Sequence, residues 1–204
     1  MSSLVRRDWE DAREIAGPMI EDAGAHSMAL WVAFSRHILG GALVNLEEPE
    51  AALKELRLGR DEAEKLNNNI FKPMTLRFEA QALSSLGRHD DAIACLDTAL
   101  EIVEATDERW WESDIHRLRG DIVRHLNSAA SDSEASFKRA MAIAADQKAR
   151  LFELRSAVAL GGLWRDQGRG EEARVVLAAI YDWFTEGFDT PDLRDAKALL
   201  DELS

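Results

Sequence analysis

The chain has 204 residues, of which 46% are hydrophobic and 31% charged, and its formal net charge is −13 at pH 7. The hydrophobic fraction is too high for a disordered chain, and so acidic a protein is a poor partner for nucleic acid or an anionic membrane. The sequence contains neither an apolar run of transmembrane length nor a signal peptide, and its single Cys95 excludes an internal disulfide framework, so we expect a cytoplasmic location.

Ten helices are predicted in chain order, and together they form a single repeat domain over residues 1–204. The first helix, residues 4–23, has no partner before it, so residues 1–24 are interpreted as the second helix of a repeat. Pro18, which follows Gly17, should kink or end this helix. Helix pairs are predicted over 25–67, 70–105, 108–146 and 149–186, and a capping helix over 190–203.

Prolines and glycines mark the ends of these helices. Pro49 and Pro73 fit the first turns of their helices, where a missing N–H costs nothing. Gly87 and Gly168 fit the turns between paired helices, because glycine commonly terminates a helix. Thr190 stands before a proline and an aspartate, which predicts an N-cap for the last helix.

Small residues recur about every 40 positions and predict how the helices pack. The first set is 40, 40 and 41 residues apart, at Gly40, Ala80, Gly120 and Gly161. A second set follows about a dozen positions later, at Ala52, Ala92, Ser133 and Ala173. Large residues come four positions further on, at Leu56, Leu96, Phe137 and Leu177. Spacings of three and four place residues on one helical face, so a fixed period of this size predicts a helical repeat array.

The repeat resembles the tetratricopeptide (TPR) pattern of paired helices. Gly161, Trp164, Gly168 and Ala173 carry this resemblance. A TPR is about 34 residues long, and the extra residues here would lengthen each helix by less than a turn. The resemblance implies an all-α fold, an α-α superhelix that forms a TPR-like solenoid of antiparallel helix pairs with a period of about 40 residues.

From about residue 105 to its end, the chain also resembles the C-terminal tail of large bacterial signalling proteins. In those proteins a class III adenylate/guanylate cyclase domain and a signal-transduction ATPase domain precede TPR-like repeats. The matching stretches are residues 109–112, 116–120, 153–155, 163–168 and 181–190. This resemblance implies a regulatory or interaction module, and any cyclase or ATPase activity would lie in domains absent from this chain.

No sequence motif for catalysis, a cofactor or a metal is present. The phosphate-binding Gly-x-x-x-x-Gly-Lys-Ser/Thr loop, the His-Glu-x-x-His and Cys-x-x-Cys metal sites and the Gly-x-Ser-x-Gly motif are all missing. His89 and two aspartates near Cys95 could suggest a metal site, but a turn, an acidic helix start and a half-buried thiol account for them better. We therefore expect no enzyme activity, no cofactor and no metal.

Two interpretations of function are open. The favoured one is a non-catalytic protein–protein interaction or regulatory module of a bacterial signalling protein. The alternative is a small-molecule-sensing regulatory domain, which is less favoured because no polar cluster is evident within an apolar pocket. Trp164 follows the apolar register and is expected in the core. Trp110 and Trp111 are adjacent and cannot both face inward, so one of them is an interface candidate.

A row of basic residues predicts a peptide groove. One stands three residues before the small position of three successive pairs, at His37, Arg77 and Arg117. Because arginine binds carboxylates in bidentate geometry, such a row would select an acidic segment or a C-terminal carboxylate. The groove candidates are His37, Arg77, Gln81, Arg117, Asp121, Arg124, Arg155 and Arg165. The same arginines could instead pair with glutamates of adjoining helices.

The first helix also predicts self-association. Its face with Ala12, Ala16 and Met19 should pack on the pair that follows. Its other side lacks the helix that an intact repeat would supply, and an exposed apolar helix face tends to recruit a partner.

Overall fold

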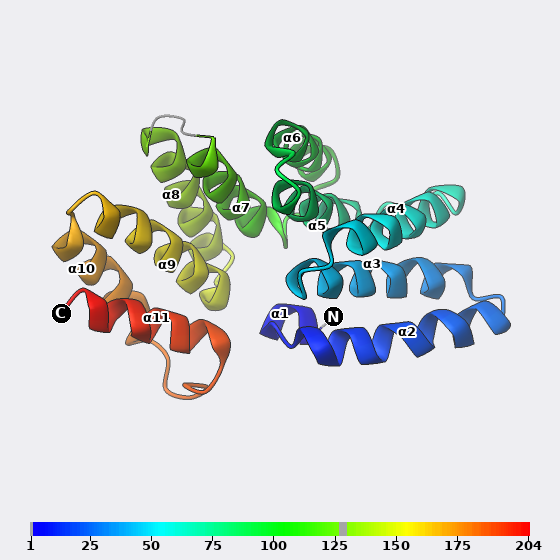
Figure 1. Ribbon diagram of the computed structural model, residues 1–204, viewed down its shortest axis with the longest axis horizontal. Helices are drawn as coiled ribbons and strands as arrows, with labels where there is room; N and C mark the ends of the chain where they lie inside the picture. Colours follow the sequence, from blue (N-terminus) through cyan, green and yellow to red (C-terminus); the bar gives the residue numbers. More distant parts are fainter. Residues whose placement is uncertain (1, 127–129) are drawn as a thin grey trace. The chain divides into compact units, whose positions relative to one another are not determined.

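The computed structural model describes residues 2–126 and 130–204. Within these ranges the regular elements are eleven α-helices, and no strand occurs (Figure 1). The helices group into two compact units, which are called unit 1 (residues 1–108) and unit 2 (residues 109–204) below. The all-helical prediction is therefore confirmed for the described residues.

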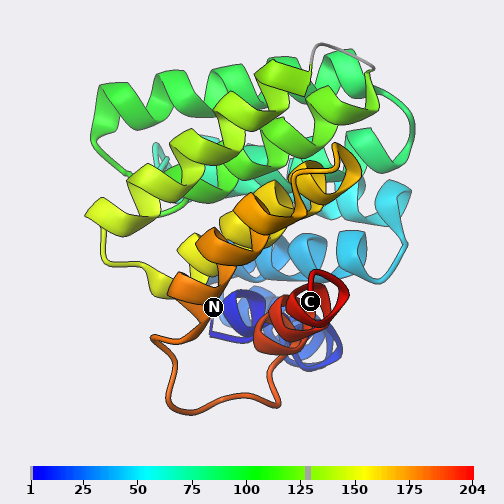
Figure 2. The same ribbon diagram turned by 90° about the vertical axis from the view of Figure 1, so that its left-hand side faces the viewer.

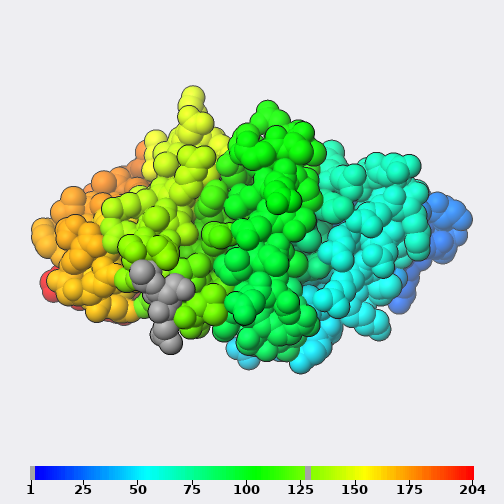
Figure 3. All heavy atoms as spheres, turned by 90° about the horizontal axis from the view of Figure 1, so that it is seen from above, coloured from blue at the N-terminus to red at the C-terminus, as the bar shows by residue number. Residues whose placement is uncertain are grey.

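Unit 1 is a row of helices joined by short turns. It contains α1 (Ser2–Arg6), α2 (Trp9–Ala25), α3 (Ala29–Asn45), α4 (Pro49–Lys65), α5 (Lys72–Ser85) and α6 (His89–Thr106). From α2 to α6 each helix packs against the next, and α1 packs against α2 and α3 (Figure 1). Figure 3 shows the outer side chains of α6 (green) on the surface of this unit.

Unit 2 repeats this arrangement and adds a final helix. It contains α7 (Glu112–His125), α8 (Ala130–Asp146), α9 (Arg150–Asp166), α10 (Gly170–Tyr181) and α11 (Pro191–Glu202). Successive helices pack together from α7 to α10, and α11 packs against both α9 and α10. The loop that joins α10 to α11 extends well beyond the ends of both helices (Figure 2).

The small-residue register is confirmed by burial. Ala52, Ala80 and Ala92 are fully buried, as are the large residues that follow in the register, Leu56, Leu96, Phe137 and Leu177. The glycines allow close helix approach, since a Cβ on Gly120 would lie 2.5 Å from Cε1 of Phe137. A Cβ on Gly40 would likewise overlap the Leu56 side chain. The 40-residue period therefore follows from where paired helices touch.

The turns recur at half of this period. A left-handed residue with positive φ occurs about every 20 positions, at Arg7, Ser27, Glu47, Asn67, Gly87, Asp107, Lys148 and Gly168. The position expected near residue 127 lies outside the described residues. The predicted turn roles of Gly87 and Gly168 are confirmed. Where a side chain replaces glycine, backbone hydrogen bonds hold the turn, such as the bond from Glu48 N to the Leu43 carbonyl at 3.0 Å.

The first predicted helix is wrong in its bounds. It is two helices, because the chain turns at Arg7 with a φ of 63°. Pro18 does not end α2, which continues to Ala25. A proline ring normally meets the Cβ of the residue before it, and Gly17 has no Cβ. Ala12 and Ala16 are buried as predicted.

The end of unit 2 also differs from the prediction. The helix expected to reach residue 186 ends at Tyr181. Thr190 precedes α11, but it makes no side-chain capping bond to that helix. Its hydroxyl donates instead to the Gly187 carbonyl at 2.7 Å. Pro49, Pro73 and Pro191 lie in the first turns of their helices, as predicted.

The predicted burial of the tryptophans is confirmed. Trp164 is buried in a cluster with Phe137 and Leu160, and the Arg169 guanidinium lies 4.5 Å from its ring centre. Trp111 is 2% exposed and packs on the Phe152 ring, whereas Trp110 is 38% exposed.

Candidate binding site

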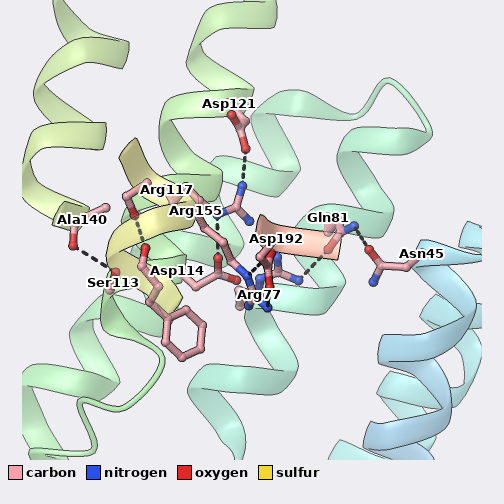
Figure 4. Close-up of polar contacts among 12 residues, drawn as sticks. Asn45, Arg77, Gln81, Ser113, Asp114, Arg117, Asp121, Ala140, Arg155 and Asp192 are labelled. Atoms are coloured by element: carbon pink, nitrogen blue, oxygen red, sulfur yellow. Dashed lines mark hydrogen bonds and ion pairs between the residues drawn. The ribbon is translucent and has the colours of Figure 1, made fainter. Parts of the chain in front are cut away.

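Three predicted groove residues lie in unit 1, and two of them belong to one polar chain. The Arg77 guanidinium donates to Oε1 of Gln81 at 2.5 Å, and Nε2 of Gln81 donates to Oδ1 of Asn45 at 3.0 Å (Figure 4). Arg77 is largely buried, and its guanidinium lies 4.5 Å from the centre of the Phe78 ring. These hydrogen bonds therefore link α5 to α3. His37 is not part of it.

In unit 2, Arg117 is held by two carboxylates of its own helix. It donates to Asp114 at 2.7 Å and to Asp121 at 2.6 Å (Figure 4). Burial disfavours the charged guanidinium, but the two carboxylates outweigh this and raise the pKa of Arg117. The predicted pair Arg117 and Asp121 thus lies together as an internal ion pair.

The remaining arginines of unit 2 connect helices. Arg155 of α9 donates two hydrogen bonds to Asp192 of α11, at 2.8 and 2.7 Å, and the Asp192 side chain is 2% exposed (Figure 4). Arg124 and Arg165 both pair with Asp166, and Arg165 also pairs with Glu202 of α11 at 2.6 Å. The described structure gives each of these arginines a carboxylate partner.

A pocket that the sequence did not reveal lies in unit 1, between α3, α4 and the start of α5. It is a small hollow with room for about one water molecule. Its lining comes from α3 (Leu30, Ala33, Phe34, His37), α4 (Arg60, Ala63, Glu64) and residues 68–75 (Asn68, Asn69, Phe71, Lys72, Thr75). Polar side chains from all three segments stand in this lining beside the apolar ones.

His37 is the unusual residue of this pocket. It is 3% exposed, and neither ring nitrogen has a side-chain hydrogen-bond partner among the described residues. Burial lowers the pKa of His37 to about 4; a contact with the Gly59 backbone, which can accept a hydrogen bond from the ring, opposes this shift, and the Arg60 charge adds to it. The ring lies against Gly59, where an added Cβ would be 2.9 Å from Nε2. At neutral pH His37 is an uncharged imidazole with one N–H donor and one acceptor nitrogen.

The charges around the pocket are compensated. Arg60 donates to both carboxylate oxygens of Glu79, at 2.7 and 2.8 Å, and Lys72 donates to Glu64 at 2.8 Å. Glu79 is 2% exposed, and burial raises its pKa against the influence of Arg60. The pocket therefore presents no charged group that lacks a counter-charge.

Five exposed, large apolar side chains line the pocket or stand within two residues of its lining in the sequence, and they are called the apolar patch here. Their exposed fractions are 46% for Met28, 44% for Leu30, 48% for Trp31, 44% for Leu66 and 56% for Ile70. The Trp31 ring contacts Phe34 edge-on at 5.9 Å, and Phe34 contacts Phe71 at 4.8 Å. The adjacent Leu30 and Trp31, which lie outside the small-residue register, were the sequence signal for this patch.

Other candidates for chemistry are accounted for locally. The described residues contain no cluster of three or more His, Cys, Asp or Glu side chains that could hold a metal ion. Nδ1 of His89 lies 3.1 Å from the Ser84 hydroxyl, and burial raises the pKa of the half-buried Cys95 thiol. No described helix has the length and apolar character needed to cross a bilayer.

Known structures share the fold of this chain at low sequence identity. No protein-family model and no curated protein matches the sequence. Two crystal structures of the nearly identical TPR-like repeats of a kinesin light chain-like protein from Podosopora anserina match with TM-scores of 0.62 and 0.61, at 15% identity over 83% of each chain. The Rap protein complexed with competence and sporulation factor matches with a TM-score of 0.65 at 12% identity. That match covers 98% of this chain and 60% of Rap. The chain thus has a TPR-like helical repeat fold.

Proposed function

We propose that this chain is a non-catalytic protein–protein interaction module that binds a segment of a partner protein. The observation that carries this proposal is the apolar patch of unit 1, whose members line the pocket or stand next to its lining in the sequence. Large apolar side chains grouped on an exposed surface mark interaction sites in monomeric proteins. The TPR-like fold supports the proposal, since Rap, a structural neighbour, was solved with a bound factor.

A small-molecule-sensing role is the second candidate, and the buried His37 in the pocket lining, which has no side-chain hydrogen-bond partner among the described residues, favours it. In that case a ligand would contact α3, α4 and the start of α5 together and change how they pack. Thermal unfolding with candidate ligands, in the wild type and in a His37→Leu variant, tests this role. A ligand that raises the melting temperature of the wild type alone would support it.

Two finer proposals concern biological context and come from the sequence. The first is that the module belongs to a bacterial signalling system with a cyclase and an ATPase, which the reading frame upstream can test. The second is that the predicted groove residues recognise an acidic segment. Such a segment would compete with carboxylates already bound to Arg117, Arg155 and Arg165.

A separate proposal from the sequence is self-association through α1 and α2, which sedimentation can test.

Affinity capture with the full chain tests the main proposal. The variant Trp31→Ser with Ile70→Ser removes two members of the apolar patch. Its matched control is Trp183→Ser with Val175→Ser, which removes a tryptophan and a β-branched side chain of comparable exposure in unit 2, 57% and 56%. A captured protein is then purified and titrated against each variant.

We expect the wild type and the control variant to bind the same purified partner. The patch variant should bind it at least about ten-fold more weakly, since truncating a buried anchor costs on the order of 1–2 kcal/mol or more. Equal affinity of all three proteins would contradict a role for the patch. Absence of any partner that binds in purified form would contradict the function.

A further inference from the structure

We infer that the loop between α10 and α11 is a second binding surface of this chain, and that it binds a basic segment of a partner protein. The loop comprises residues 182–190 and is called the aromatic loop here. It lies in unit 2, so the inference does not rest on the apolar patch of unit 1. It depends on exposed aromatic rings that stand among unpaired carboxylates.

Two large aromatic side chains of this loop are exposed. Trp183 is 57% exposed and Phe188 is 47% exposed. Figure 2 shows the loop (orange) extending well beyond the ends of the two helices that it joins. Large apolar side chains grouped on an exposed surface mark interaction sites, and tryptophan and phenylalanine are enriched in protein interfaces. The aromatic loop therefore has the composition of a binding surface.

Neighbouring rings hold the exposed ones in place. Trp183 contacts Phe184 edge-on at 5.2 Å between ring centres, and Phe188 contacts Tyr181 at 5.9 Å. Phe184 and Tyr181 in turn pack against the buried cluster of unit 2 that includes Leu177. The exposed rings are thus anchored to the core, which lowers the entropy that binding would cost.

Carboxylates give the loop its charge. Asp182, Glu186 and Asp189 are exposed, and none of them forms an ion pair with a described residue. The sequence from residue 175 to 193 contains no Lys, Arg or His. Opposite charges favour association across an interface, and the net charge of −13 attracts a cationic partner from a distance. The loop therefore favours a partner that carries Lys or Arg.

The Trp183 ring already accepts one arginine. The Arg150 guanidinium lies 5.5 Å from its ring centre and donates to Glu153 at 2.6 Å. The ring is still 57% exposed beside this contact. Tryptophan is the best aromatic partner for a cation, and arginine also binds carboxylates in bidentate geometry. An arginine of the partner thus suits both kinds of group in the aromatic loop.

The exposed rings point to a protein segment as the source of these cations. A free polyamine would pair with the carboxylates but would leave the rings of Trp183 and Phe188 in water. Apolar side chains that stand between the arginines of a segment would cover those rings, and removing apolar surface from water is favourable. The inferred ligand is therefore a segment in which arginines alternate with apolar residues.

The test titrates the full chain with three probes and follows the indole N–H signals of the tryptophans by NMR. The probes are a capped Arg-Leu-Arg-Leu-Arg peptide, a capped Gln-Leu-Gln-Leu-Gln peptide and spermine, all at physiological ionic strength, where long-range attraction is screened. We expect the arginine peptide to shift the Trp183 signal, which Trp183→Phe assigns. It should bind at least about ten-fold more tightly than either other probe.

One pair of variants separates the loop from the general negative charge of the chain. The loop variant neutralises the exposed carboxylates of the aromatic loop, with Asp182→Asn, Glu186→Gln and Asp189→Asn. The control neutralises as many exposed carboxylates of unit 1, with Glu14→Gln, Glu21→Gln and Glu101→Gln. All these changes keep the shape of the side chain, so both variants should fold. We expect the loop variant to bind the arginine peptide at least about five-fold more weakly, and the control to stay within about two-fold of wild type.

A second pair tests the aromatic rings. Trp183→Ser with Phe188→Ser should weaken binding of the arginine peptide at least about five-fold. The matched control Trp31→Ser with Ile70→Ser removes a tryptophan and a large apolar side chain of comparable exposure from unit 1, 48% and 56%, and should have no effect. If loss of the rings impairs folding, the charge variants still test the inference.

The inference is wrong if the arginine and glutamine peptides bind equally, if spermine binds as tightly as the arginine peptide, or if that peptide does not bind at millimolar concentration. It is also wrong if the two charge variants weaken binding equally, because the attraction then comes from net charge alone. Loss of peptide binding in the unit 1 control would place the peptide on unit 1 and contradict the inference as well. None of these results affects the proposed function, whose partner is tested on the apolar patch.

Discussion

His37 in unit 1 and Arg117 in unit 2 occupy the same position of the repeat and behave in opposite ways. Each lies three residues before a glycine of the small-residue register. His37 is buried as a neutral group without a side-chain hydrogen-bond partner among the described residues, whereas Arg117 is charged and bound by Asp114 and Asp121. Repeat position thus places a residue near the helix interface, and its neighbours decide its chemistry.

The neighbours that differ are one helical turn away. Arg117 has aspartates three residues before it and four residues after it. At the matching positions around His37 the chain has Phe34 and Gly41. Residues at these spacings share one helical face, so α7 can neutralise a buried cation while α3 can only surround a neutral ring. The contrast teaches that the same repeat position holds a cation paired with carboxylates in unit 2 and a buried neutral imidazole in unit 1.

The largest expected effect comes from breaking the ion pairs of Arg117. Arg117→Ala should lower the free energy of unfolding by about 3–5 kcal/mol, because it removes the cation from the buried Asp114. His37→Leu should leave the free energy of unfolding unchanged or raise it. Urea unfolding of both variants measures the difference. A loss below about 1 kcal/mol for Arg117→Ala would contradict the structural role, and would reopen the predicted groove role of this residue.

A smaller effect is expected from filling the close approach of α7 and α8. Gly120→Ala should cost about 1–3 kcal/mol, since the new methyl group would meet the buried Phe137 ring at 2.5 Å. The control is Gly162→Ala in α9, where nothing lies within 4 Å of the added Cβ. That variant should stabilise the protein by about 0.5–1 kcal/mol through helix propensity. Thermal melts that rank the two variants in the reverse order would show that the register is wrong.

The third effect is a pH dependence that belongs to the pocket of unit 1. The folded-state pKa of His37 is about 4, below its ordinary value of 6.5. As the pH falls from about 6.5 toward 4, the unfolded state takes up a proton that the folded state does not, so stability is lost across this window. The loss should approach about 1 kcal/mol per pH unit.

His37→Leu should remove the part of this pH dependence of stability that His37 contributes. The rest should remain, because burial also lowers the pKa of His116 to about 4. The measurement is urea unfolding of wild type and variant at pH 7 and pH 5. Identical losses in the two proteins would show that His37 titrates normally in the folded state.

The smallest effect compares two serines at one position of the repeat. Ser35 of α3 and Ser156 of α9 each lie five residues before a small residue of the register, and both are fully buried. The Ser156 hydroxyl donates to the Phe152 carbonyl at 2.9 Å, whereas that of Ser35 has no partner among the described residues. Ser35→Ala should therefore raise the free energy of unfolding by about 0.5–1 kcal/mol, and Ser156→Ala should not. Equal changes in denaturant melts would contradict this.

The sequence by itself determined the helical fold and its register. Small and large residues recur with a fixed period because paired helices touch at the same points in every repeat, and the same contacts are present between Gly40 and Leu56 and between Gly120 and Phe137. Helix starts at Pro49 and Pro73 and turns at Gly87 and Gly168 were also predictable, because the backbone limits of proline and glycine are local.

Only the tertiary structure decided what the polar residues do. The partners of Arg155 and Arg165 lie 37 residues further along the chain, on α11, and no local pattern specifies such a pair. The pocket needed three segments to meet around His37, with the Phe34 and Phe71 rings brought together from α3 and the start of α5. Burial and the fate of each hydrogen bond depend on residues distant in the sequence, which is why the periodicity revealed the fold but not the site.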